Sequence, residues 1–235
     1  MPRVFVPPGQ MPAIIGTDAH YVRDVLRMKT GDLLELFDGT GKVYTAKILN
    51  IEKGKINCKV FSSKESENEL KVKVTLVQAL PKGGKMDFII EKCTELGARS
   101  IIPMLTERTI GKSNKIERWK KISKEAAEQS GRAYIPDIQP LTKFEEVLKL
   151  RKQFSLALIP WELETEKTLK QVLTDPRIPG SPDILFLVGP EGGFSQNEIE
   201  QAKEAGFISV SLGKRILRTE TAAMAVLSAI MYELG

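Results

Sequence analysis

Two short glycine-containing loops are the parts of this sequence best suited to hold a ligand. Residues 189–193 (GPEGG) follow the apolar run 184–188, and a second loop starts at Gly213 after the apolar run 208–212. In an α/β sheet, ligands bind where loops leave the carboxyl ends of the strands, and glycine lets the backbone approach a ligand closely. The loops are therefore predicted to grip a ligand through backbone amide and carbonyl groups, although a pair of tight strand-to-helix turns would give the same pattern.

The glycine spacing disfavours two common nucleotide sites. A phosphate-binding P-loop needs a glycine, four further residues and then Gly-Lys-Ser or Gly-Lys-Thr, and a dinucleotide fold needs Gly-x-Gly-x-x-Gly. Neither loop has either spacing. An uncharged or cationic ligand remains, held mainly by backbone groups, with Glu191 available as a hydrogen-bond acceptor.

The other residues that commonly carry chemistry are sparse. The chain has one histidine, His20, and two cysteines, Cys58 and Cys93, which lie far apart in sequence. This usage does not suggest a disulfide framework or a metal cluster, so no metal is expected. Residues 1–16 lack the basic start and continuous apolar stretch of an export signal, and charges interrupt every apolar run. We therefore expect a cytoplasmic protein.

The positive charge of the chain is concentrated in one segment. The net charge is +5, and residues 99–132 contain nine Lys or Arg against four Glu. Such a run forms either a solvated helix face or a surface that faces nucleic-acid phosphates. The charge alone leaves both interpretations open.

The pattern of apolar residues divides the 235-residue chain near residue 70. The first part is predicted to be a small, mostly antiparallel β-barrel with one helix at 20–28, followed by a polar linker at 62–69. The second part alternates strands and helices, which is typical of an α/β fold with a parallel sheet. The strands expected in the first part span residues 3–6, 33–37, 43–49 and 56–61.

Helix start and stop signals organise the second part. Helical spacing from Met86 to Leu96 ends at Gly97, which suits a left-handed C-terminal cap. Ser195 and Glu198 form the sequence pattern of a capping box, and Gly206 ends that helix. A further helix is expected from Ile116 and a closing helix over 221–234. The expected strands span 72–80, 100–104, 155–159, 184–188 and 208–212.

Two long motifs carry a resemblance to a known family. Residues 187–195 (LVGPEGGFS) and 212–222 (LGKRILRTETA) resemble the RsmE family of 16S ribosomal RNA (uracil-N3)-methyltransferases. Shorter stretches agree with the same family in the same order. These are residues 81–83, 94–97 and 125–132, and His20 with residues 25–27 and Gly31.

The resemblance implies a fold and an activity. The implied fold is a PUA-like β-barrel over 1–70 that binds RNA, followed over 71–235 by a SPOUT methyltransferase domain with a C-terminal trefoil knot, a rare exception to unthreaded chains. It also implies a homodimer that uses S-adenosylmethionine to methylate one uridine of small-subunit RNA, conventionally numbered 1498. Cofactor-binding positions follow at Leu187, Val188, Gly189, Pro190, Glu191, Gly192, Gly193, Leu212, Gly213, Ile216, Leu217, Arg218, Thr221 and Ala222.

Methyl transfer from a sulfonium to nitrogen mainly requires alignment and exclusion of water. Uracil N3 must also lose its proton, and negative charge then spreads onto the neighbouring carbonyl oxygens. Arg218 and Arg132 are candidates for a cation near those oxygens. Glu220 is the candidate proton acceptor, although pairing with an arginine or capping the last helix would explain it equally well.

Five basic residues are candidate RNA-phosphate contacts. They are Arg23, Arg27, Lys82, Arg108 and Lys112. Two other functions remain open: a 2′-O-ribose methyltransferase of the same superfamily, and a non-catalytic protein that binds RNA or assists ribosome assembly.

Overall fold

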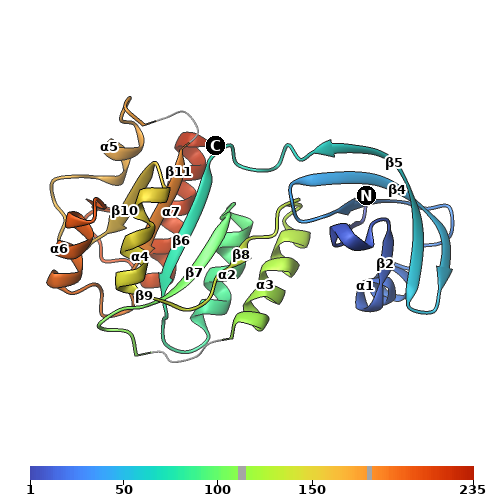
Figure 1. Cartoon of the computed structure of the whole chain (residues 1–235), viewed down its shortest axis with the longest axis horizontal. Coiled ribbons are helices and arrows are strands. Elements are labelled where there is room, and N and C mark those ends of the chain that lie inside the picture. Colours follow the sequence, from blue (N-terminus) through green and yellow to red (C-terminus); the bar gives the residue numbers. More distant parts are fainter. Residues whose placement is uncertain (111–114, 179–181) are drawn as a thin grey trace. The chain divides into compact units, whose positions relative to one another are not determined.

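The computed structural model describes residues 1–110, 115–178 and 182–235, which form two compact units (Figure 1). Unit 1 contains Met1–Glu69 together with Lys124–Ile135, and unit 2 contains Leu70–Ser123 and Pro136–Gly235. The chain therefore returns to unit 1 after residue 123, which the pattern of apolar residues did not reveal.

Unit 1 is built on a five-stranded sheet with a main apolar core and a smaller one formed by Phe37, Val43 and Ala133. Its strands lie in the order β1-β3-β4-β5-β2, with β1 parallel to β3 and the other neighbours antiparallel. Alternate residues of β4, including Ala46 and Ile48, face the core, as expected for a sheet with one solvated side. The strands are β1 (Arg3–Phe5), β2 (Ala13–Ile15), β3 (Leu33–Phe37), β4 (Lys42–Glu52) and β5 (Lys55–Glu65).

Two local predictions for unit 1 were wrong. The helix expected at 20–28 begins earlier, as α1 (Gly16–His20), and continues as a π-helical turn over Tyr21–Val25. The polar segment expected to be a linker instead extends β5 to Glu65, because Lys42 to Tyr44 of β4 supply backbone partners for its polar residues.

Unit 2 contains a parallel sheet, which confirms the α/β prediction. Within the described residues it has seven strands in the order β12-β10-β11-β6-β7-β8, with β9 also pairing with β7, and every pairing is parallel. The strands are β6 (Lys73–Ala79), β7 (Ser100–Leu105), β8 (Asp137–Ile138), β9 (Thr142–Lys143), β10 (Leu156–Pro160), β11 (Asp183–Val188) and β12 (Ile208–Val210).

Helices cover both faces of this sheet. Side chains of α2 (Lys85–Glu95), α5 (Leu169–Leu173) and α7 (Thr219–Leu234) share one apolar core with the sheet, and Trp119 of α3 (Ile116–Gln129) joins them. Residues of α4 (Phe144–Leu150) and α6 (Gln196–Glu204) pack in a second core, on the other face (Figure 1). Because both faces of the sheet are covered, β11 consists almost entirely of apolar residues, with the sequence DILFLV.

No helix in the described ranges is long and apolar enough to cross a membrane. Both cysteines are free and buried, in separate units. Burial raises the pKa of the Cys58 thiol to about 11 and that of Cys93 to about 12, so each is protonated at neutral pH. Both act as small apolar core residues.

Gly97 gives a direct test of how α2 ends. Its φ is +98°, and a Cβ there would lie 2.6 Å from Leu70 Cδ1. The Ala98 amide donates to the Cys93 carbonyl at 2.9 Å, which is the bond of a Schellman cap. We expect Gly97→Ala to lower the free energy of unfolding by about 1–3 kcal/mol, measured by urea denaturation. Gly9→Ala, where a Cβ meets nothing within 4 Å, is the control, and an equal loss in both variants would contradict this account.

Candidate functional site

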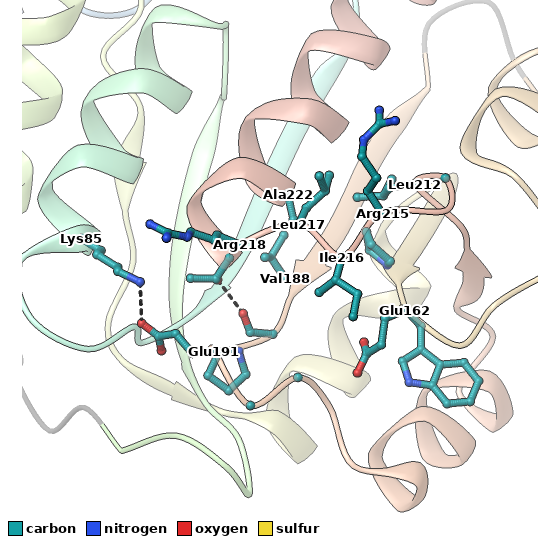
Figure 2. Close-up of a pocket in the computed structure, with 18 of the residues that line it drawn as sticks. Lys85, Glu162, Val188, Glu191, Leu212, Arg215, Ile216, Leu217, Arg218 and Ala222 are labelled. Atoms are coloured by element: carbon teal, nitrogen blue, oxygen red, sulfur yellow. Dashed lines mark hydrogen bonds and ion pairs between the residues drawn. The ribbon is translucent and has the colours of Figure 1, made fainter.

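The two glycine loops lie side by side around a cavity of about 510 Å³ in unit 2. Val188, Ile216 and Leu217 contribute apolar surface between the loops (Figure 2). The volume is in the range of roughly 300–1,000 Å³ that is usual for small-molecule sites. The lining consists of Lys85, Pro160, Trp161, Glu162, Val188, Gly189, Pro190, Glu191, Gly192, Gly193, Leu212, Gly213, Lys214, Arg215, Ile216, Leu217, Arg218, Thr219 and Ala222.

The loop after β11 is a tight turn fixed at both ends. The Gly193 amide donates to the Pro190 carbonyl at 2.9 Å, and Gly193 has a φ of +66°, which favours glycine. Ser195 then caps α6, with the Glu198 amide donating to its hydroxyl at 3.2 Å and the Glu198 carboxylate accepting from the Ser195 amide at 2.9 Å. The predicted capping box is confirmed, and it sets where the glycine loop ends.

A buried chain of hydrogen bonds ties the two loops to the sheet. Gln78, fully buried on β6, donates from Nε2 to the Thr219 hydroxyl at 2.9 Å. Thr219, the first residue of α7, donates from its hydroxyl to the Gly189 carbonyl at 2.6 Å. The end of one glycine loop is thereby joined to the start of the other through a single side chain.

Lys85, at the start of α2, links acidic residues from both loop regions. Its Nζ lies 3.0 Å from Glu191 Oε1 and 3.4 Å from Glu220 Oε2 (Figure 2 shows the first contact). Hydrogen bonding to Glu191 raises the pKa of Lys85, so this amine stays charged. Apart from the Lys85 contact, Glu220 Oε2 is buried without a hydrogen-bond partner in the described part of the chain. The charge of Glu220 is therefore balanced by Lys85.

Glu191 is fixed in its ionised form. Partial burial pushes the pKa of this carboxyl upward, but hydrogen bonds from its own amide, Lys85 and the Lys82 amide outweigh that effect and hold the pKa below the usual range. The Lys82 amide lies 3.1 Å from Oε1. The acceptor that the sequence offered to a ligand is thus used to hold the loop.

A second hollow lies on the other side of the same loop. Arg108 Nη1 donates to the Gly192 carbonyl at 2.8 Å, so the guanidinium braces the loop from this side. The hollow has a volume of about 400 Å³ and shares Glu191 and Gly192 with the first cavity. Its lining is Lys82, Glu107, Arg108, Thr109, Ile110, Glu191 and Gly192.

Most of the cofactor positions inferred from the motifs line the first cavity, but two do not. Leu187 is fully buried in the core of the sheet, and Thr221 is exposed on α7. The sequence reasoning missed seven lining residues, of which Thr219, Lys214 and Arg215 lie inside the quoted motif and could have been included. The other four, Lys85, Pro160, Trp161 and Glu162, come from elements distant in sequence, and no local signal marked them.

The three candidate catalytic residues do not lie together in one unit. Arg218 lines the cavity as the residue before α7, and Glu220 lies in the first turn of that helix. Arg132 lies in unit 1, where its guanidinium is 4% exposed and forms an ion pair with Glu69 at 2.7 Å. A buried charge of this kind needs its partner, which gives Arg132 a structural role, and its part in catalysis stays a prediction.

The candidate RNA contacts are distributed over both units. Lys82 and Arg108 line the second hollow of unit 2. Arg23 pairs with Asp24 at 2.6 Å in unit 1, and Arg27 has a φ of +54°, a rare backbone conformation for a residue other than glycine. Lys112 lies outside the described residues. Among the residues that are described, no group of three or more His, Cys, Asp or Glu is placed to share a metal ion.

Comparison with known proteins matches most of this chain to one family. Residues 68–231 match a family described as an RNA methyltransferase domain. The chain belongs to this family. Residues 14–61, within unit 1, match the PUA domain of RNA methyltransferases.

Relatives in this RNA methyltransferase family are similar over nearly the whole chain. A ribosomal RNA small subunit methyltransferase E from Bacillus subtilis (strain 168) is 34% identical over 231 residues, covering 94% of this chain and 90% of that protein. One from Synechocystis sp. is 42% identical over 214 residues, covering 90% and 69%. The resemblance carried by the two glycine motifs is confirmed.

A solved structure of a family member has the same fold. The ribosomal RNA small subunit methyltransferase E from Neisseria gonorrhoeae, bound to S-adenosyl methionine, is 37% identical and superposes with a TM-score of 0.86. The match covers 99% of this chain and 97% of that one.

Titration of Glu191 should be visible in the stability of the protein. Its folded-state pKa is below the ordinary value of 4.5, so its contribution to stability is complete above pH 4.5 and is lost as pH falls through the lowered folded-state pKa. We expect Glu191→Gln to be less stable than the wild type at pH about 7, and the difference in the free energy of unfolding to shrink by pH about 3. Glu204→Gln, exposed at the end of α6, is the control. A difference that stays constant with pH would contradict this role.

Proposed function

We propose that this protein transfers a methyl group from S-adenosylmethionine to N3 of a uracil in 16S ribosomal RNA, at the uridine conventionally numbered 1498. The observation that carries the proposal is the cavity formed by the two glycine loops, in a chain of the RNA methyltransferase family. The Neisseria gonorrhoeae relative, with the same fold, was crystallised with S-adenosyl methionine.

The chemistry of the cavity suits this cofactor. Its apolar wall, with Val188, Leu212 and Leu217, suits a purine ring, and the glycine loops offer backbone groups to its polar edge. The spacing of the loops does not provide a phosphate cradle, which matches a ligand without phosphates. When bound, S-adenosylmethionine supplies an electrophilic methyl group on a sulfonium.

Residues around the cavity are assigned to proton removal, charge stabilisation and positioning. We assign to Glu220 the removal of the N3 proton, which its carboxylate oxygen would accept as N3 bonds to the methyl carbon and the methyl–sulfur bond breaks to leave a neutral thioether. Arg218, whose charge is permanent, stabilises the negative charge that develops on the uracil carbonyl oxygens. The Lys85 contact holds the Glu220 side chain in place.

The proposal extends to the assembly and the substrate. Unit 1, with its PUA match, is assigned to RNA binding together with Lys82 and Arg108, and unit 2 to catalysis. We also infer a homodimer and a C-terminal trefoil knot, as the resemblance implies. Met231 and Tyr232 are both exposed at the end of α7 and offer an apolar surface to a second copy. We also propose a cytoplasmic location, which suits a ribosomal RNA substrate.

The nature of the product tests the proposal directly. Purified protein, S-adenosylmethionine and unmodified small subunits or naked 16S RNA are incubated, and the RNA is digested to nucleosides for mass spectrometry. We expect N3-methyluridine, mapped to a single position. A 2′-O-methylated nucleoside would instead support the 2′-O-ribose methyltransferase. RNA binding without any methylation or cofactor binding would indicate a non-catalytic RNA-binding or ribosome-assembly protein.

The role of Glu220 predicts a selective loss of turnover. Glu220→Gln removes the proton acceptor but keeps the size of the side chain, so we expect kcat to fall about 100-fold or more while the Kd for S-adenosylmethionine stays nearly unchanged. Single-turnover methylation and calorimetry measure the two quantities. Glu233→Gln makes the same charge change at the exposed far end of α7 and serves as the control. Unchanged turnover in the Glu220 variant would rule out the assignment.

A further inference from the structure

Two carboxylates line the cavity, and only one of them is already engaged. Glu191 is held by Lys85 and by the Lys82 amide. Glu162, in the loop after β10, has no hydrogen-bond or ion-pair partner within the described ranges of the chain, although it faces the cavity (Figure 2). Its acceptor oxygens are therefore free for a ligand.

The loop that carries Glu162 is anchored on both sides of this residue. The Trp161 amide donates to the Val210 carbonyl at 3.1 Å, and the Glu164 amide closes a turn onto the Trp161 carbonyl at 3.2 Å. The Glu164 carboxylate accepts from the Ser209 hydroxyl and from the Glu166 amide at 2.9 Å, and these bonds lower the pKa of Glu164. Glu164 thus fixes the backbone of the loop, and Glu162 extends from this rigid loop.

The opposite wall is shaped to receive the Glu162 carboxylate. A Cβ at Gly193 would lie 2.7 Å from Glu162 Oε1, closer than such contacts normally are. The positive φ of Gly193 makes the turn, and the Glu162 carboxylate lies in the space that a side chain at this position would enter. The carboxylate lies directly against the glycine loop that is assigned to cofactor binding.

We propose, building on the proposed function, that Glu162 binds the ribose hydroxyls of S-adenosylmethionine and selects ligands that carry this diol. A carboxylate has two oxygens that can accept both hydroxyl hydrogens, and acidic residues hold ribose in the same manner in dinucleotide folds. Glu162 lies across the drawn lining from Lys85 and Arg218 (Figure 2). Lys85 is paired with Glu191 and Glu220, whereas Arg218 has no ion-pair partner among the described residues. Arg218 attracts the amino-acid carboxylate of the cofactor, which directs the ribose toward the Glu162 side.

The test compares ligands with and without the diol. Calorimetry with the full-length protein gives the Kd of S-adenosylmethionine, 5′-methylthioadenosine and the 2′,3′-dideoxy form of 5′-methylthioadenosine. In the wild type we expect loss of the diol to weaken binding about tenfold or more. In Glu162→Gln we expect weaker binding of both diol ligands, and the preference for the diol to fall to about twofold or less.

Matched controls separate the possible outcomes. Glu166→Gln, in the same loop and exposed, should bind all three ligands as the wild type does, and thermal unfolding should show all variants folded. If Glu162→Gln keeps the full diol preference, or loses affinity only for S-adenosylmethionine, the ribose assignment is overturned while the proposed function stands. If the wild type binds none of the three ligands, the proposed function fails and this inference with it.

Discussion

The hydrogen-bond chain from Gln78 through Thr219 to the Gly189 carbonyl is the constraint on which the site depends. All three groups are at least partly buried, where a polar atom that loses its partner is costly. Since the chain joins β6, the loop after β11 and the start of α7, the two glycine loops are adjacent only when the sheet is assembled. The ligand cavity is therefore a property of the whole of unit 2.

Charge is distributed unevenly around this cavity. Lys85 and Arg218 lie on one side, and Glu162 lies on the other together with Arg215 of the second glycine loop (Figure 2), while Glu191 is already neutralised by Lys85. A ligand with a purine, a diol and a charged amino-acid end would find a matching group in each region. Alignment by fixed groups of this kind is the main contribution an enzyme can make to a methyl transfer between two reactants.

Long elements with strong local signals were predictable from the sequence. The helix that ends at Gly97 and the capping box at Ser195 and Glu198 were both found, because capping chemistry depends on neighbouring residues alone. The two-residue strands β8 and β9 and the short helices α4 and α5 were missed, because they carry too few residues for a period to show. The linker prediction failed because strand pairing uses backbone groups. The polar residues at the end of β5 can therefore pair with β4 although their side chains are not apolar.

The family, the α/β alternation and the two glycine motifs could all be recognised from the sequence, since each rests on residues close together in the chain. Which side chains meet those motifs became clear only from the folded arrangement. Lys85 and Glu162 reach the cavity from elements more than 25 residues away from either loop, and Arg132 is drawn into an ion pair with Glu69. The physical reason is that burial and Coulomb contacts act between neighbours in space, which no local pattern encodes.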